Sequence, residues 1–326
     1  MTPLYPLKFK PQAKATVWGG NKLNTLFNKP FPSTEKIGES WELSAVQRSL
    51  SVVTNGFLKG NTIEELAEVY LGELLGEKNY ERFGIEFPVL VKLIDAAETL
   101  SVQVHPDDET ARIRHNAYGK TEMWHVLQAD NGAGLYVGFN RNLTATEFYD
   151  RIQNNTLLET LNFVTVQPGD TFFITPGTIH AIGKGIVLAE IQQTSDITYR
   201  IYDWGREHNP ATARAMHVDQ AIDIIDYVKK TEAKIDYATL PNEPVQLVDS
   251  PYFVTNLVAI NRPLARNLSG NDSFVIYVCI GGDATIQCGK NSEILTKGET
   301  LLVPAAIADF TLLPSPEAKL LETYII

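Results

Sequence analysis

The sequence predicts a mostly β protein built from short antiparallel strands arranged as a barrel or jelly roll. Three observations support this fold class. Short runs rich in β-branched and aromatic residues recur between glycines and prolines: FPVLVKLI, LSVQV, MWHVL, GLYVGF, NFVTV, TFFIT and IVLAEI. Helical signals are few. An internal repeat indicates that one β unit occurs twice.

The predicted helices follow recognisable start signals. Thr62 and Glu65 form a capping box that opens a segment running to Gly76 with one apolar stripe. Thr144 and Glu147 form a second such box. A third candidate, after an aspartate, carries its apolar side chains on one face: Ile222, Ile225 and Val228. We therefore expect a few helices inserted in and around the strands.

The repeat relates two stretches of the chain. GDTFFITPGTIH, which ends at His180, matches GETLLVPAAIAD, which ends at Asp309. Upstream, EMWHVLQADNGAGLYVG from Glu122 aligns without gaps to SFVIYVCIGGDATIQCG from Ser273. The second copy thus has serine and aspartate where the first has glutamate and histidine. We expect one copy to carry polar ligands and the other to have lost them.

The length of 326 residues makes two domains the default expectation. Residues 231–250 are polar, contain two prolines and lack periodicity, so we interpret them as the connection. The predicted domains are residues 1–235, the catalytic domain with helical insertions, and residues 236–326, a β domain without metal ligands.

Composition excludes several function classes. The net charge of −11 disfavours nucleic acid and anionic membranes as partners, and any anionic substrate requires a local basic cluster. No stretch approaches the roughly 20 apolar residues that span a bilayer. Two cysteines and an N-terminus without an apolar leader favour the reducing cytoplasm. We expect a cytoplasmic protein whose partners are small molecules, monomeric or weakly dimeric.

Four side chains form a candidate metal site. Gln103 and His105 lie two apart, so on a strand they point to the same face, and Pro106 ends that strand. Glu122 opens the next strand, and His180 follows a proline–glycine turn. Two neutral imidazoles and a carboxylate are a common catalytic zinc set.

The amide oxygen of Gln103 is an unusual fourth ligand that keeps the site positively charged and strengthens the ion as a Lewis acid. A lone Q-x-H motif also fits a buried histidine bonded to a backbone carbonyl. The histidine–proline pair, the glutamate at this spacing and the PGTIH turn together favour the metal site.

Longer motifs point to a family. QVHPDDE, GKTEMW, PGTIHAI and EIQQTSDITYRIYDWGR resemble type I mannose-6-phosphate isomerases of the cupin superfamily, in particular its short bacterial branch. The likeness runs from Trp18 to Arg206 and more faintly to the C-terminus. It implies two cupin-like jelly-roll barrels and one zinc ion per chain. The implied ligands are Gln103, His105, Glu122 and His180, and the implied active-site arginine is Arg200.

The resemblance implies interconversion of mannose 6-phosphate and fructose 6-phosphate through an enediol. This reaction needs a stabiliser for the developing oxyanion and a carrier for the proton. Zinc suits the first role. Arg200, permanently cationic and forked, can bind enediolate oxygens but is a poor base. A structural ion pair with Asp203 or Asp196 is the alternative role for Arg200.

The proton carrier stays open at this stage. Glu190 is a candidate base, or else a carboxylate that orients a zinc-bound histidine. Lys120 lies two residues before Glu122 and can polarise a hydroxyl or contact phosphate; otherwise it is a solvated loop lysine. Trp18 is a candidate for lining the sugar pocket, with core packing as the alternative.

The phosphate site also stays open. Longer members of the family carry a serine–lysine pair soon after the histidine–proline pair, where this chain has Asp107 and Asp108. Two acids there repel phosphate. The basic candidates are Arg112, Arg114, His115, Lys120 and Arg200.

Two other function classes fit parts of the pattern. An iron-dependent cupin oxygenase uses two histidines and one carboxylate, but Gln103 and Arg200 fit a sugar phosphate better. A non-enzymatic sugar-binding cupin requires the metal cluster to be vestigial, whereas here the cluster is complete.

Overall fold

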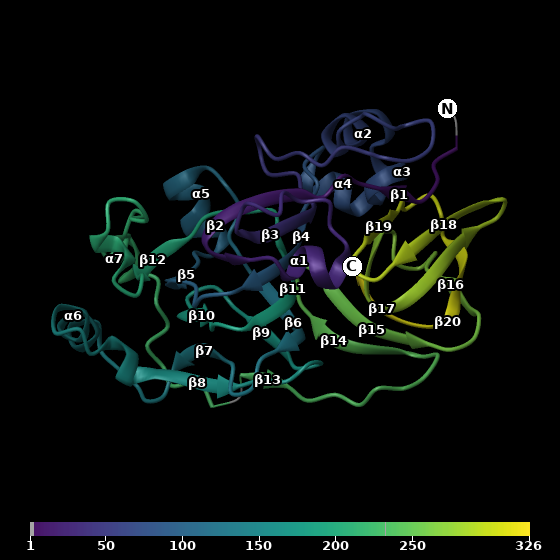
Figure 1. Cartoon of the computed structure of the whole chain (residues 1–326). Helices are drawn as coiled ribbons and strands as arrows, with labels where there is room; N and C mark the ends of the chain where they lie inside the picture. Colours follow the sequence, from purple (N-terminus) through teal and green to yellow (C-terminus); the bar gives the residue numbers. More distant parts are fainter. Residues whose placement is uncertain (1–2, 232) are drawn as a thin grey trace.

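The computed structural model describes residues 3–231 and 233–326. Within these residues the strands are antiparallel partners in three sheets of seven, five and eight strands (Figure 1). The predicted mostly β class is therefore confirmed. The pairing gives three separate sheets rather than two closed barrels.

The seven-stranded sheet forms one side of the N-terminal part of the chain. Its strands lie in the order β13-β9-β6-β11-β4-β3-β2. Their bounds, in that order, are Lys234–Ile235, Thr171–Ile174, Glu122–Ala129, Ile186–Gln193, Val89–Ala96, Ile37–Leu43 and Gln12–Gly20. β4 and β11 are buried along their whole length, so this is the central part of the sheet.

The five-stranded sheet lies against it, in the order β12-β5-β10-β7-β8. The bounds are Tyr199–Tyr202, Val102–Val104, His180–Ile182, Gly134–Phe139 and Leu161–Thr165. Apolar side chains of both sheets form one buried cluster, including Ile94 and Trp124 of the first and Leu135 and Ile182 of the second. Trp18 belongs to this cluster and is 2% exposed, which places it in the core.

The eight-stranded sheet contains most of the C-terminal part, at the right of Figure 1. Its main path is β1-β19-β17-β20-β15-β14, with β16 on β20 and β18 on β17. The bounds are Leu7–Lys8, Thr300–Val303, Val275–Cys288, Asp309–Tyr324, Val254–Ile260, Pro244–Asp249, Leu264–Asn267 and Asn291–Thr296. Because β1 comes from the N-terminus, residues 236–326 do not form this sheet alone. The predicted domain limits stay a prediction.

The helices are short and lie around the sheets (Figure 1). They are α1 (Lys22–Phe27), α2 (Ile63–Tyr70), α3 (Gly72–Leu75), α4 (Glu77–Phe83), α5 (Asp108–His115), α6 (Ala145–Gln153) and α7 (Val218–Ala221), with the 3-10 turns η1 (Leu157–Thr160) and η2 (Arg206–His208).

The predicted helix starts are confirmed, but two helices end early. Thr62 and Glu65 form the predicted capping box of α2, and Thr144 caps α6. The segment to Gly76 is split, because Leu71 has a positive φ of 48° and separates α2 from α3. The third predicted helix is only the four residues of α7, and Val228 is 59% exposed rather than on a buried face.

The predicted connection over residues 231–250 is more ordered than expected. β13 pairs with β9 of the seven-stranded sheet, and β14 is an edge strand of the eight-stranded sheet. The segment therefore links the two sheets and also extends both of them.

Strand register corrects the repeat alignment. Glu122 is the register partner of Ile174. Ile174 aligns with Val303 in the repeat, and the register partner of Val303 is Val275. The gapless alignment that placed Ser273 opposite Glu122 is therefore wrong by two residues. Since valine is apolar, the second copy still lacks a ligand at this place.

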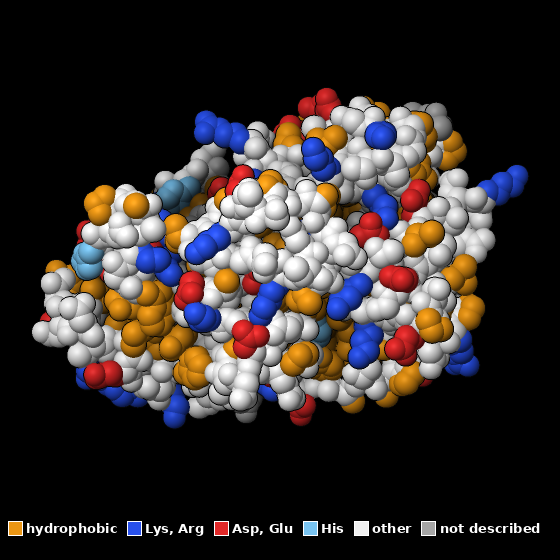
Figure 2. All heavy atoms as spheres, in the orientation of Figure 1, with side chains coloured by type: hydrophobic (Ala, Val, Ile, Leu, Met, Phe, Trp, Pro, Cys, Tyr) orange, Lys and Arg blue, Asp and Glu red, His pale blue; other side chains and the backbone are white. Residues whose placement is uncertain are grey.

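Two surface features bear on partners. Among the described residues, helices long and apolar enough to cross a membrane are absent. On the face drawn in Figure 2, lysine and arginine side chains are interspersed with acidic ones rather than gathered into one basic patch. A continuous basic face is what a nucleic-acid-binding surface requires.

Candidate metal centre

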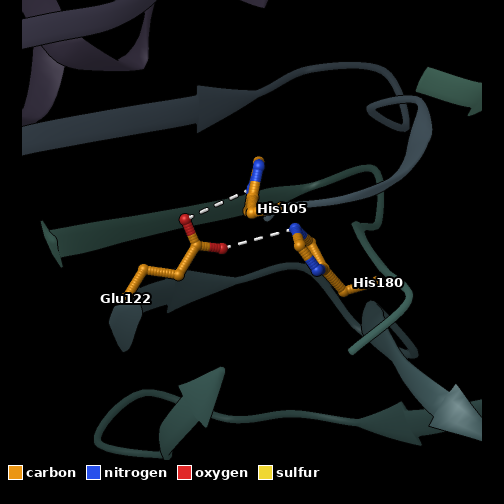
Figure 3. A group of neighbouring side chains, drawn as sticks. All are labelled: His105, Glu122 and His180. Carbon is orange, nitrogen blue, oxygen red and sulfur yellow. Dashed lines mark ion pairs between the residues drawn. The ribbon is translucent and has the colours of Figure 1, made fainter. Parts of the chain in front are cut away.

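Three of the predicted ligands meet where the two N-terminal sheets face each other. His105 follows the end of β5, Glu122 is the first residue of β6, and His180 is the first residue of β10. All three are buried, and their ligand atoms lie within 4.8 Å of one another (Figure 3). The Glu122 carboxylate approaches His105 Nε2 at 3.6 Å and His180 Nε2 at 3.3 Å.

The surroundings of this cluster suit a divalent cation. His105 Nδ1 donates to the carbonyl of Ile197 and His180 Nδ1 to that of Thr178, each at 2.8 Å. These bonds fix the tautomer, so both Nε2 lone pairs face the cluster. Burial lowers the pKa of His180 to about 4 and that of His105 well below its ordinary value. Both imidazoles are therefore neutral, as metal ligation requires.

One oxygen of the Glu122 carboxylate is unpartnered. Glu122 Oε1 is buried and lacks a hydrogen-bond partner among the described residues. A buried orphan oxygen is costly, and a cation between the three side chains would satisfy it. The residues present therefore fit a metal ion.

Gln103 reaches the same place, but its amide nitrogen rather than its oxygen faces His180. It is the register partner of His180 on one side and of Arg200 on the other. Its Nε2 lies 3.3 Å from His180 Nε2, and its Oε1 lies 3.3 Å from Ser101 Oγ. Ligation through Oε1 requires a half-turn of the amide, which exchanges these two atoms.

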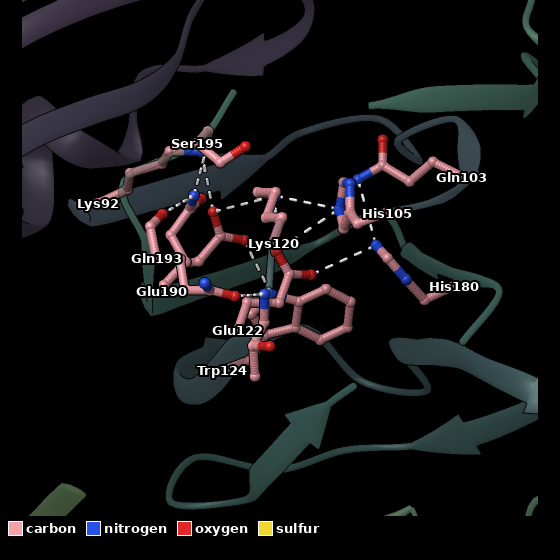
Figure 4. A network of polar contacts seen from close by, with 12 residues as sticks. Lys92, Gln103, His105, Lys120, Glu122, Trp124, His180, Glu190, Gln193 and Ser195 are labelled. Carbon is pink, nitrogen blue, oxygen red and sulfur yellow. Dashed lines mark hydrogen bonds and ion pairs between the residues drawn. The ribbon is translucent and has the colours of Figure 1, made fainter. Parts of the chain in front are cut away.

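Lys120 is a buried residue of the site, not a solvated loop lysine. Its side chain is 4% exposed, and Nζ lies 2.6 Å from Glu122 Oε2 and 3.1 Å from His105 Nε2. The ammonium group thus touches two members of the cluster (Figure 4). It is placed to donate to any oxygen bound beside them.

Glu190 lies behind Lys120 with both carboxylate oxygens engaged. Oε1 accepts from Lys92 Nζ at 2.9 Å, and Oε2 accepts from Trp124 Nε1 at 2.9 Å. Lys120 Nζ is 3.9 Å away. Burial raises the pKa of Glu190, but the charges of Lys120 and Lys92 outweigh it and hold the pKa at about 2. The group is therefore ionised and fully hydrogen-bonded.

Arg200 lies on β12 with its side chain half-buried. Nε donates to Ser101 Oγ at 3.2 Å, and one terminal nitrogen donates to the carbonyl of Ala215 at 2.8 Å. Among the described residues its guanidinium forms no ion pair, so the expected alternative, a pair with Asp203 or Asp196, is wrong. Burial and the charge of the nearby Arg214 lower its pKa.

Sequence reasoning missed two further arginines beside Arg200. Asp203 is fully buried and accepts hydrogen bonds from Arg206 at 2.7 Å and from Arg214. Two guanidinium groups therefore bond one carboxylate. With Arg200 nearby, the three arginines and Asp203 carry a local excess of two positive charges in a chain of net charge −11. The signal available in the sequence was the run of arginines downstream of the active-site motif.

The other basic candidates lie elsewhere. Arg114 pairs with Asp223, and His115 bonds the hydroxyl of Tyr199. Arg112 lines a surface pocket of about 780 Å³ whose other charged side chains are acidic: Glu86, Asp108, Glu109 and Asp196. The structure does not bring these three residues to the metal cluster.

Known proteins resemble the chain over nearly its whole length. It is 35% identical to the mannose-6-phosphate isomerase of Streptococcus mutans over 303 residues, which cover 93% of each chain. The isomerase ManA of Bacillus subtilis is also 35% identical, over 94% of this chain and 95% of its own. The chain belongs to the mannose-6-phosphate isomerase family. It is therefore an enzyme, an isomerase.

Family models and solved structures agree with this membership. Residues 6–123 match the catalytic domain of type I phosphomannose isomerase, and residues 244–320 match the cupin domain of mannose-6-phosphate isomerase. The crystal structure of the Bacillus subtilis isomerase superposes with a TM-score of 0.88 at 30% identity, covering 99% of this chain. A putative mannosephosphate isomerase from Archaeoglobus fulgidus superposes with a TM-score of 0.81 at 25% identity over 99% of this chain.

Proposed function

We propose that this enzyme interconverts mannose 6-phosphate and fructose 6-phosphate, through an enediol, with the help of a zinc ion. The observation that carries the proposal is the buried cluster of His105, Glu122 and His180, with Lys120 in contact with two of its members. Membership of the isomerase family supports the substrate pair.

The metal would be held by the two histidines and Glu122, with Gln103 as a fourth ligand after its amide turns. Two imidazoles with a carboxylate are a donor set that zinc accepts, and one site is expected per chain. When bound, zinc would stabilise negative charge that develops on the substrate oxygens.

The chain's own groups supply the rest of the chemistry. Arg200 cannot lose its proton, so we assign it to hydrogen bonding with the enediolate oxygens rather than to proton transfer. Lys120 Nζ is the group in contact with the cluster that can hold or pass a proton beside the substrate. We keep Lys120 and Glu190 as the candidate proton carriers.

Of these two, Lys120 has the stronger case. A carboxylate with a pKa of about 2 accepts a proton poorly at neutral pH. Glu190 is also tied on both oxygens to Lys92 and Trp124. We therefore propose that Glu190 acts mainly by holding these side chains, and Lys120, in position.

The arginine cluster supports a phosphorylated substrate. Arg200, Arg206 and Arg214 with the single Asp203 carry two excess positive charges, which match a phosphate dianion. Within this cluster we assign the phosphate to Arg206 and Arg214, which are held by Asp203. Arg200, the register partner of Gln103, is kept for the enediolate oxygens at the carbonyl end.

We also propose how the sheets form cupin units. The seven- and five-stranded sheets would be the two faces of one jelly roll, since their apolar side chains share a core. The eight-stranded sheet would form a second, smaller unit that contributes no catalytic group. Residues 1–235 and 236–326 remain our proposed division.

A coupled assay tests the proposed function. Purified enzyme is supplied with mannose 6-phosphate, and fructose 6-phosphate is measured before chelation, after chelation and after zinc is added back. We expect turnover before chelation, loss of turnover after chelation, and recovery of turnover when zinc is added back. Absence of turnover in a zinc-loaded, folded sample would reject the substrate pair, and full turnover in a verified metal-free sample would reject the metal.

A further inference from the structure

Buried polar atoms without partners are concentrated beside the metal cluster. Among the described residues, seven buried side-chain oxygens lack a hydrogen-bond partner. Four of them belong to two short segments that pair with each other: Thr121, Glu122, Gln192 and Thr194. Folded proteins satisfy nearly all such groups, so a concentration of exceptions needs an explanation. The metal explains Glu122 only.

Gln192 lies next to the metal ligands. It is the register partner of Glu122 on the neighbouring strand, and antiparallel partners present their side chains on the same face of a sheet. Glu190, two residues earlier on β11, points to that face as well and lies 3.9 Å from Lys120. Gln192 is fully buried, so its free oxygen has no access to bulk solvent.

The amide of Gln192 is fixed in one orientation. Its Nε2 donates to the carbonyls of Gln193 at 2.8 Å and Ser195 at 2.6 Å. Carbonyl oxygens only accept, so the amide cannot turn over without losing both bonds. Oε1 is therefore held in one position as an unused acceptor.

Thr194, two residues after Gln192, is a second residue with an unpartnered buried oxygen. It is 6% exposed, its hydroxyl has no partner, and it lines the pocket of about 780 Å³ together with Ser195 and Tyr118. Thr194 therefore borders an open pocket. Two unused acceptors this close along the chain suit a ligand that carries several hydroxyl groups.

We propose that Gln192 is a substrate-binding residue whose Oε1 accepts a hydrogen bond from a hydroxyl group of the sugar phosphate, with Thr194 Oγ1 as a second contact for a neighbouring hydroxyl. This inference rests on the proposed function. Among the described residues no donor, Lys120 Nζ included, bonds Gln192 Oε1, so we assign the donor to the ligand. A water on the metal is the other source of an O–H donor, and the test separates the two.

The test compares Gln192→Met, which keeps the length of the side chain but removes the acceptor, with the wild-type enzyme. The substrates are mannose 6-phosphate and its 3-deoxy and 4-deoxy analogues. We expect kcat/KM for mannose 6-phosphate to fall roughly tenfold or more. For the analogue that lacks the partner hydroxyl, wild type and variant should have nearly equal kcat/KM. Thr194→Val should show the same pattern, more weakly, with the other analogue.

Three controls make the result decisive. Thr300→Val removes an unpartnered buried hydroxyl in the eight-stranded sheet and should leave kcat/KM unchanged. Thermal stability and metal content show that the variants are folded and loaded. If Gln192→Met does not fold, Thr194→Val carries the test, since it loses only a hydroxyl.

Each outcome has one meaning. An equal fall for all three substrates would show that neither of these hydroxyl groups is the partner and would overturn the substrate contact. Unchanged kcat/KM in both variants would also overturn it. Wild-type turnover in the same assay tests the proposed function by itself, so failure of the function and failure of the Gln192 contact are distinguishable.

Discussion

Glu190 and Glu322 occupy the same place in two different sheets. Glu190 on β11 has Trp124 and Lys92 as its register partners on the flanking strands, and both bond its carboxylate. Glu322 on β20 has Tyr277 and Asn256 as its partners, and both bond its carboxylate as well. The strand orders β9-β6-β11-β4 and β19-β17-β20-β15 correspond.

The two carboxylates differ in what lies beyond them. Glu190 faces Lys120 and through it the metal cluster. Glu322 is fully buried and is closed off by Arg266, which donates to both of its oxygens. Both oxygens of Glu322 are thus occupied by described side chains of the same unit, so this carboxylate is not free to bind a ligand.

We therefore predict that the second unit is catalytically silent. Asp309→Ala should leave turnover near that of the wild type, because Asp309 is exposed and its carboxylate accepts a hydrogen bond from Asn267, far from the metal cluster in sequence. Metal analysis should give one ion per chain. A second stoichiometric ion, or a large fall in kcat in the variant, would contradict the prediction.

Removal of the metal should abolish activity without unfolding the protein. The sheets have large apolar cores of their own, so the ion is not needed to hold them together. Activity and circular dichroism are measured on the same chelated sample, and His180→Ala should behave in the same way. Loss of β structure on chelation would show that the ion is structural.

Arg200→Ala should lower kcat by about 10²–10³, the usual loss when one oxyanion-stabilising donor is removed. The reason is that Arg200 stays charged and lies beside Gln103 in register. Steady-state kinetics are compared with Arg200→Lys as the matched control. Lysine keeps the positive charge but lacks the planar guanidinium group, so the comparison separates the effect of charge from that of geometry. An increase in KM with an unchanged kcat would instead make Arg200 a uniform binder of phosphate.

Arg214→Ala should raise KM for mannose 6-phosphate by roughly tenfold with a smaller change in kcat, since phosphate is bound equally in the ground and transition states. Inorganic phosphate should inhibit the wild type more strongly than the variant. Arg114→Ala is the control, because Arg114 pairs with Asp223 away from the cluster. Equal phosphate inhibition in all three enzymes would show that Arg214 does not contact phosphate.

Stability should fall between pH 6.5 and pH 4 in part because of His125. Burial lowers the pKa of His125 to about 4, below the ordinary value of 6.5, so the unfolded chain binds the proton first. The stabilisation is complete above pH 6.5 and is lost as the pH falls through 4, by about 3 kcal/mol at most. Denaturant unfolding at each pH should show a shallower loss for His125→Asn. Parallel curves for the two proteins would contradict this assignment.

The sequence by itself determined the features that depend on neighbours along the chain. The strand-rich runs, the helix caps at Thr62 and Thr144, and the donor atoms of the predicted histidine, glutamate and glutamine ligands are all local patterns. Two-residue spacing on a strand also predicts correctly that Gln103 and His105 reach one place, because side-chain direction alternates along extended backbone.

Only the tertiary structure decided the features that depend on which distant strands pair. Strand register made Val275, not Ser273, the counterpart of Glu122. The fold brought Arg206 and Arg214 onto one buried carboxylate. It also left Gln192 Oε1 without a hydrogen-bond partner among the described residues. The physical reason is that hydrogen-bond satisfaction and charge balance are sums over all groups in contact, and those contacts exist only after the chain has folded.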